Sequence, residues 1–125
     1  MSQFMLLLYD NRAAWAKMSP AEMQKAIEKY MAWTKKPFTV DSKRLGEDPG
    51  KVVRPSNGKA HTADGPFSET KEVLGGFYLI EARDLNEAIQ VASRLPSAPL
   101  GTVEVRPCRD LEVDGVPRRA SSKPR

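Results

Sequence analysis

Charged side chains gather around one turn near the middle of the chain. Asp64 stands directly before Gly65 and Pro66, two residues that restrict the backbone to a few turn conformations. A carboxylate held beside an apolar sheet has a raised pKa and can serve as a general acid or base, so Asp64 is our candidate acid–base residue. The alternative role is structural, because an aspartate at a turn also bonds to the backbone amides ahead of it. A turn alone does not require the three charges that follow, from Glu69, Lys71 and Glu72, and these count toward a binding role. Phe67 either forms a wall of a pocket or packs in the core.

Three polar side chains elsewhere extend this candidate site. Glu104 and Arg106 alternate with two valines, so they share one face of a strand. They form either an ion pair on an exposed or dimer-facing surface, or part of a polar cavity between two subunits together with Asp64. His61 is a weaker candidate for a base or proton shuttle, because it is the single histidine and lies in a polar segment. The candidate ligand-binding residues are therefore Gly65, Pro66, Phe67, Glu69, Lys71, Glu104 and Arg106.

The sequence gives no sign of a cofactor or a metal centre. One histidine, one cysteine and scattered carboxylates are too few for a zinc or non-haem iron site. The pair Gly75-Gly76 lacks the spacing of a phosphate-binding loop and the three glycines of a dinucleotide site. We expect this pair to allow close backbone packing where a strand begins, and we expect no cofactor and no metal.

The net charge of +4 does not indicate a nucleic-acid-binding protein. The excess lies in a short tail rich in serine, proline and arginine, which we expect to be disordered and solvated, and the rest of the chain is balanced. We therefore expect no direct binding of nucleic acid. The longest apolar run, Phe4 to Tyr9, is far shorter than the roughly 20 residues of a membrane span. With no secretory pattern at the N-terminus and a lone cysteine, we expect a cytoplasmic protein without membrane contact.

Two strand–helix–strand units follow one another along the chain. Helix starts are marked by Ser19-Pro20 with Glu22, and by Asp84 with Glu87, both of which fit a capping box. The first helix also carries one mostly apolar stripe at spacings of three and four residues, formed by Met23, Ala26, Ile27, Tyr30, Met31 and Thr34. The pair Asn57-Gly58 predicts a peripheral hairpin. The expected elements are a strand at 4–9, a helix from 20 to Pro37, a strand at 38–45, hairpin arms at 51–54 and 59–62, a strand at 76–81, a helix from 85 to Pro96 and a strand at 102–106.

This order predicts an α+β fold. Two tandem units of this kind are typical of a ferredoxin-like antiparallel sheet with both helices on one face. The strands at 4–9 and 77–80 are apolar at consecutive positions, so the second face of the sheet also needs cover. A second copy of the chain would supply that cover, and we therefore expect a homodimer through the open sheet face.

Several of these segments together resemble a known family. The stretch from Asp64 to Glu72, the run Gly75-Gly76-Phe77-Tyr78, and Val103 to Pro107 are similar to the YCII-related domain family, in the branch named for its DGPF motif. The first strand and the helix start at Ser19 fit the same branch. The resemblance covers about residues 3–107, so we assign residues 1–108 to this domain and 109–125 to the basic tail. It implies a dimeric α+β barrel.

Two functions stay open at this point. The first is a small-molecule-binding or sensory accessory dimer. The second is a cofactor-free enzyme in which Asp64 is the acid–base residue and Arg106 orients an anionic substrate. The resemblance also implies a functional link to an extracytoplasmic sigma factor, because some proteins of this branch are found near or fused to such factors.

Overall fold

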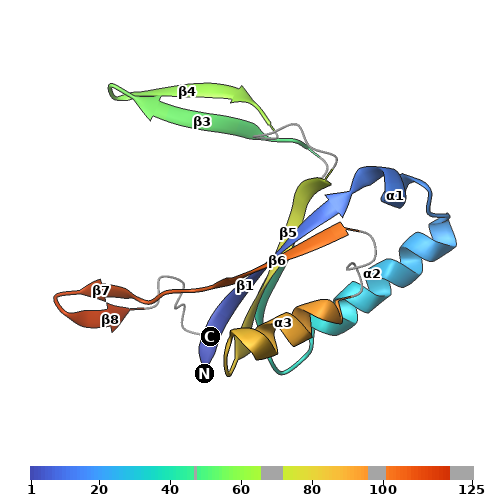
Figure 1. The fold of residues 1–125 in the computed structure, drawn as a ribbon. Helices are drawn as coiled ribbons and strands as arrows, with labels where there is room; N and C mark the ends of the chain where they lie inside the picture. The colour runs from blue at the N-terminus through green and yellow to red at the C-terminus, as the bar shows by residue number, and fades with distance from the viewer. Residues whose placement is uncertain (47, 66–71, 96–100, 119–125) are drawn as a thin grey trace.

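The protein is a mixed α+β structure built on one antiparallel sheet of four strands, in the order β2-β5-β1-β6 (Figure 1). A computed structural model describes residues 1–46, 48–65, 72–95 and 101–118. The elements of the body are β1 (Ser2–Asn11), α1 (Arg12–Ala16), α2 (Pro20–Thr34), β2 (Thr39–Arg44), β5 (Glu72–Ala82), α3 (Leu85–Ser93) and β6 (Gly101–Pro107). Two hairpins are added to this body, β3 (Lys51–Ser56) with β4 (Lys59–Asp64), and β7 (Leu111–Val113) with β8 (Val116–Arg118).

Strand β1 lies inside the sheet because its residues are apolar on both faces. Phe4, Leu6 and Leu8 are buried on the face that the helices cover, and Asp10 continues the same alternation. Met5 and Leu7 point the other way and are only half-buried. The two faces of the sheet are therefore both apolar, but the structure covers one of them more fully than the other.

Both long helices begin where the sequence predicts. The side chain of Ser19 accepts from the amide of Glu22, and Glu22 accepts in return from the amide of Ser19, each at 3.1 Å. At α3 the Asp84 carboxylate accepts from the amide of Glu87 at 2.9 Å. These bonds satisfy amides that have no partner inside the first turn, and so they fix the start of each helix.

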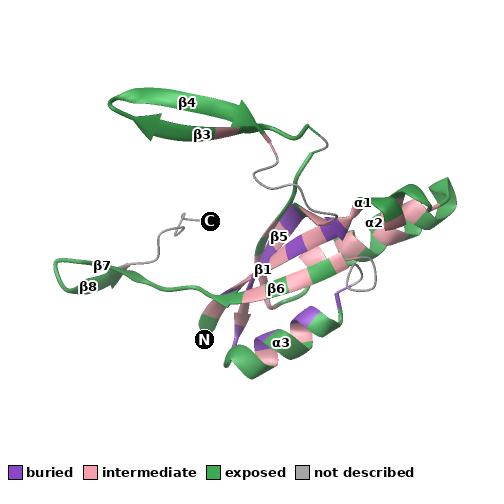
Figure 2. Cartoon of the chain, turned by 45° about the horizontal axis from the view of Figure 1, so that its top comes forward, coloured by how far each residue is buried: buried purple, intermediate pink, exposed green. Residues whose placement is uncertain are grey.

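The two helices pack against the same side of the sheet in different ways (Figures 1 and 2). Helix α3 packs close to the sheet, because its inner residues Ala88 and Ala92 are small and buried. Helix α2 has no buried residue and approaches the core through two large aromatic side chains, Tyr30 and Trp33. The core is thus dense under α3, and α2 stands further from the strands over its first turns. This separation makes room for the cavity described below.

The hairpins extend away from the body (Figure 1). The β3–β4 turn has positive φ at both central positions, 51° at Asn57 and 75° at Gly58, as a tight hairpin with the twist of its strands requires. All of β4 is exposed (Figure 2). The predicted hairpin is therefore confirmed, and each arm is longer than expected.

The coarse prediction of an α+β fold with an antiparallel sheet is confirmed, but one helix and one hairpin were missed. Helix α1 is only five residues long, too short to show a helical period. The β7–β8 hairpin lies in the segment that we assigned to a tail, and its turn is formed by Asp114 and Gly115, both at positive φ. Residues 119–125 lie outside the described part, so their disorder stays a prediction. No helix in the described part is long and apolar enough to cross a membrane.

Candidate functional site

The predicted acid–base residue lies at the end of an exposed hairpin. Asp64 is the last residue of β4, opposite Lys51 in the register, and its side chain is 84% exposed. The ammonium group of Lys51 forms an ion pair with the Asp64 carboxylate. Next to it, the amide of Gly65 donates to the carbonyl of Gly50 at 3.1 Å. A side chain at Gly65 would meet the carbonyl oxygen of Pro49 at 2.2 Å, so this glycine is needed for the close turn.

The other predicted residues are distributed over separate sheets. His61 lies on β4, opposite Arg54, and is exposed. Glu104 and Arg106 lie on β6 of the main sheet, where the hydroxyl of Tyr9 donates to Glu104 at 3.1 Å. Within one chain, the fold thus brings Glu104 and Arg106 to one strand but leaves Asp64 and His61 on the hairpin. Four members of the predicted set fall outside the described residues, namely Pro66, Phe67, Glu69 and Lys71.

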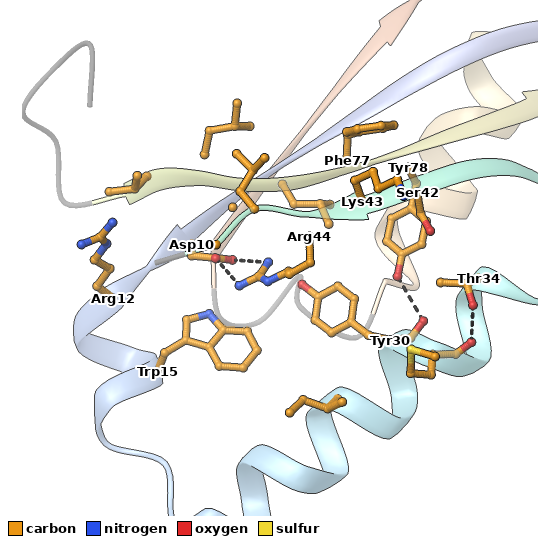
Figure 3. Close-up of a pocket in the computed structure, with 18 of the residues that line it drawn as sticks. Asp10, Arg12, Trp15, Tyr30, Thr34, Ser42, Lys43, Arg44, Phe77 and Tyr78 are labelled. Atoms are coloured by element: carbon orange, nitrogen blue, oxygen red, sulfur yellow. Dashed lines mark hydrogen bonds and ion pairs between the residues drawn. The ribbon is translucent and has the colours of Figure 1, made fainter. Parts of the chain in front are cut away.

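A cavity of about 900 Å³ lies elsewhere, between the helices α1 and α2 and the end of the sheet (Figure 3). Its apolar wall comes mainly from α2, where Met23, Ile27 and Met31 face it, and Leu8 lies in the sheet below. Ile27 is 47% exposed and Met31 is 56% exposed, although both belong to the apolar stripe of the helix. The stripe that the sequence predicts along α2 therefore lines a hollow instead of filling it.

An ion pair lies on the sheet side of this cavity. Asp10 is the buried polar residue of the described core, and its carboxylate is bonded by both terminal nitrogens of Arg44, from the end of β2 (Figure 3). Such a two-pronged contact fixes the orientation of the guanidinium as well as its position. The side chain of Asp10 is 12% exposed, and that of Arg44 is 46% exposed. The cation is therefore the member of the pair that the cavity can reach.

Two aromatic rings hold the guanidinium from the side of the helices. Its central carbon lies 5.5 Å from the ring centre of Trp15 and 5.4 Å from that of Tyr30. Trp15 is carried by α1, whose first turn is capped by Asn11 through a 3.2 Å bond to the amide of Ala14. The indole Nε1 of Trp15 is buried and has no hydrogen-bond partner among the described residues.

Gly75 explains why Asp10 can lie where it does. A Cβ at Gly75 would come within 2.0 Å of the Asp10 carboxylate and 3.0 Å of the Arg44 guanidinium. At the next position, a Cβ at Gly76 would meet the carbonyl of Lys43 at 2.6 Å. The prediction that this glycine pair allows close packing is therefore confirmed, but the pair lies inside β5, which begins at Glu72 and not at Gly76 as expected.

Tyr78 joins the cavity to the core. Its ring stacks on Tyr30 at 6.2 Å, and its hydroxyl donates to the carbonyl of Tyr30 at 3.2 Å. Burial raises the pKa of the Tyr78 hydroxyl well above its usual value, and Tyr30 adds to the increase, whereas the positive charge of Arg44 acts against it. Tyr78 is therefore a neutral hydrogen-bond donor at physiological pH.

The sequence pointed to one residue of this site, Asp10, and did not point to its partners. Asp10 directly follows the longest apolar run, and a carboxylate that continues the buried alternation of a strand is a candidate for a paired buried charge. Arg44 and Trp15 had no such signal, because Arg44 is 34 residues from Asp10 in the chain and Trp15 contributes through its contact with Arg44. No group of three or more histidine, cysteine or acidic residues placed to hold a metal occurs in the part of the chain described.

Comparison with known proteins gives the family. The model of the YCII-related domain matches residues 2–112. The chain belongs to the YCII-related domain family. An uncharacterised protein of Rhizobium meliloti (strain 1021) is 33% identical over 113 residues, which cover 83% of this chain and 90% of that protein. The match to the YCII-related domain includes every element of the body and the whole cavity lining.

Proposed function

We propose that this YCII-related protein binds a small molecule in the cavity between α2 and the sheet, and that it works as a homodimer. The cavity carries this proposal. Its volume of about 900 Å³ is in the range of small-molecule sites, which are mostly apolar with a few fixed polar groups. Here the apolar wall of α2 faces a single oriented ion pair.

The finer features of the fold belong to the same proposal. The strand order β2-β5-β1-β6, with both long helices joined to one core, supports a ferredoxin-like arrangement. The half-buried apolar residues on the other face of β1 support a dimeric α+β barrel, in which two such sheets face each other. The sequence from Asp64 to Phe67 and the run Gly75-Gly76-Phe77-Tyr78 support membership of the DGPF branch.

The catalytic alternative has less support. It needs Asp64 as an acid–base residue with Arg106 as the substrate anchor. The carboxylate of Asp64 is 84% exposed and paired with Lys51, whereas an acid–base carboxylate is tuned by burial and by its neighbours. The two residues also belong to different sheets of the chain.

A cavity-filling variant tests the binding function. The uncharged probe N-phenyl-1-naphthylamine becomes fluorescent in apolar sites, and we expect saturable binding by the natural protein. Ile27→Trp places a large ring in the cavity and should abolish this binding. Lys25→Trp adds the same ring outside the cavity lining and should retain it. Equal binding by the two variants would show that the probe lies elsewhere and would contradict the proposal.

A further inference from the structure

The cavity presents positive charge to any molecule that enters it. Its lining includes three basic residues, Arg12, Lys43 and Arg44, and one carboxylate, that of Asp10. Lys43 lies opposite Phe77 in the register, on the other face of the sheet, so Arg44 is the basic side chain that β2 directs toward the helices. Of these three basic residues, Arg44 forms an ion pair with a residue in the described ranges. The negative charge of Asp10 lies on the buried side of the pair, so the surface that faces the cavity is cationic.

Arg44 is prepared to receive a second anionic partner. A guanidinium has five N–H donors, and the two bonds described for Arg44 both go to Asp10. Asp10 holds one edge, and the rings of Trp15 and Tyr30 hold the group from the side (Figure 3). The side chain thus loses little further freedom when it binds, which favours affinity. Its remaining donors suit the oxygens of a carboxylate or a similar anion.

The other polar groups of the wall agree with an acceptor in this position. The Nε1 of Trp15 is a donor without a partner among the described residues, and a buried donor in this state is costly. Thr34 and Ser42 add hydroxyl groups to the lining. The Thr34 hydroxyl donates to the carbonyl of Met31 at 2.6 Å, so Ser42 is the lining hydroxyl of these two that remains for a ligand oxygen.

The opposite wall determines the rest of the ligand. The cavity is lined along α2 by apolar side chains, those of Met23, Ile27 and Met31. Methionine adapts to irregular apolar shapes, so this wall suits a hydrocarbon body better than a polar one. From the charge at one side and the apolar helix at the other, we infer that the ligand is an amphipathic anion, with a carboxylate-type head at Arg44 and an apolar body along α2.

This inference rests on the proposed binding function, and a matched series of ligands separates the two. Octanoate, 1-octanol and octylamine share one hydrocarbon chain and differ in the charge of the head group at pH 7. Each is used to displace N-phenyl-1-naphthylamine from the protein. We expect octanoate to displace the probe at a concentration about tenfold lower than 1-octanol, because a hydrogen bond to a charged group contributes more than one between neutral groups. Octylamine should be the weakest of the three.

Variants of Arg44 identify the source of the preference. Arg44→Gln should bring octanoate to the level of 1-octanol, whereas Arg44→Lys should retain part of the preference. Loss of the octanoate advantage in high salt gives the same information without a substitution. Equal displacement by octanoate and 1-octanol, or stronger displacement by octylamine, would overturn the ligand class while the binding function stands. Probe binding that Ile27→Trp leaves unchanged would overturn both.

Discussion

The Asp10 carboxylate occupies the space that a side chain at Gly75 would need. This gives a prediction for a single residue. Gly75→Ala places a methyl group where the carboxylate now lies, at 2.0 Å, so the ion pair with Arg44 must shift. We expect the free energy of unfolding to fall by about 1–3 kcal/mol, as for other overpacked positions. Urea denaturation followed by circular dichroism measures this change.

Gly46→Ala is the matched control, because nothing lies within 4 Å of the Cβ it would add. We expect its unfolding free energy to stay within about 0.5 kcal/mol of the natural protein. If the two variants were equally stable, the position of Asp10 would not depend on the missing side chain at Gly75.

The same residues show what a sequence reveals about a site. Gly75 could be assigned to close packing because a glycine pair before an apolar strand has a local meaning. The partners of that packing could not be assigned, since Asp10 and Arg44 are 34 residues apart in the chain. Asp64 attracted attention for its neighbours in sequence, but burial is a property of the fold, and the buried carboxylate is that of Asp10.

At the scale of elements, local sequence patterns predicted where the helices begin, but they did not predict the distances between elements. The capping box of Ser19 and Glu22 starts α2 where predicted, because all of its atoms come from four consecutive residues. The apolar stripe along α2 was also predicted correctly, but the distance between α2 and the sheet was not predicted. That distance depends on which side chains meet across the gap, such as Tyr30 on Tyr78. The cavity was therefore outside the reach of a pattern in the sequence.

The β3–β4 hairpin gives a prediction that its local stability is independent of the stability of the body. Gly58 has φ of 75°, where a side chain costs about 1 kcal/mol. Since an isolated hairpin is only marginally stable in water, Gly58→Ala should increase amide hydrogen exchange within residues 51–64. The midpoint of thermal unfolding should stay within about 1 °C of the natural value, because the hairpin projects from the body and adds little to its core (Figure 1).

Lys59→Ala serves as the control for this variant, because Lys59 lies in the same hairpin and is exposed outside the turn. It should change neither the exchange nor the midpoint. A fall of several degrees for Gly58→Ala alone would mean that the hairpin is coupled to the core, contrary to the arrangement described.

At the scale of the whole molecule, the sheet face opposite the helices is the surface through which we expect the chain to associate. Leu7 lies at the middle of that face, between Phe77 of β5 and Glu104 of β6 in the register. Leu7 and Phe77 are half-buried in the single chain, although they are large and apolar. Two such faces packed about 10 Å apart would bury them, and a stable contact of this kind covers about 1,200–2,000 Å² in total.

This arrangement predicts a homodimer that a single charge disrupts. By light scattering coupled to size exclusion at micromolar concentration, the natural protein should have twice the mass of the chain. Leu7→Asp should have the mass of one chain and a native circular dichroism spectrum, because it buries a second carboxylate directly opposite Glu104 in the interface. Ile89→Asp adds the same charge on α3, where the residue is 49% exposed, and should leave the dimer intact. A natural protein of single-chain mass under these conditions would rule out the dimer, and the apolar face would then need another explanation.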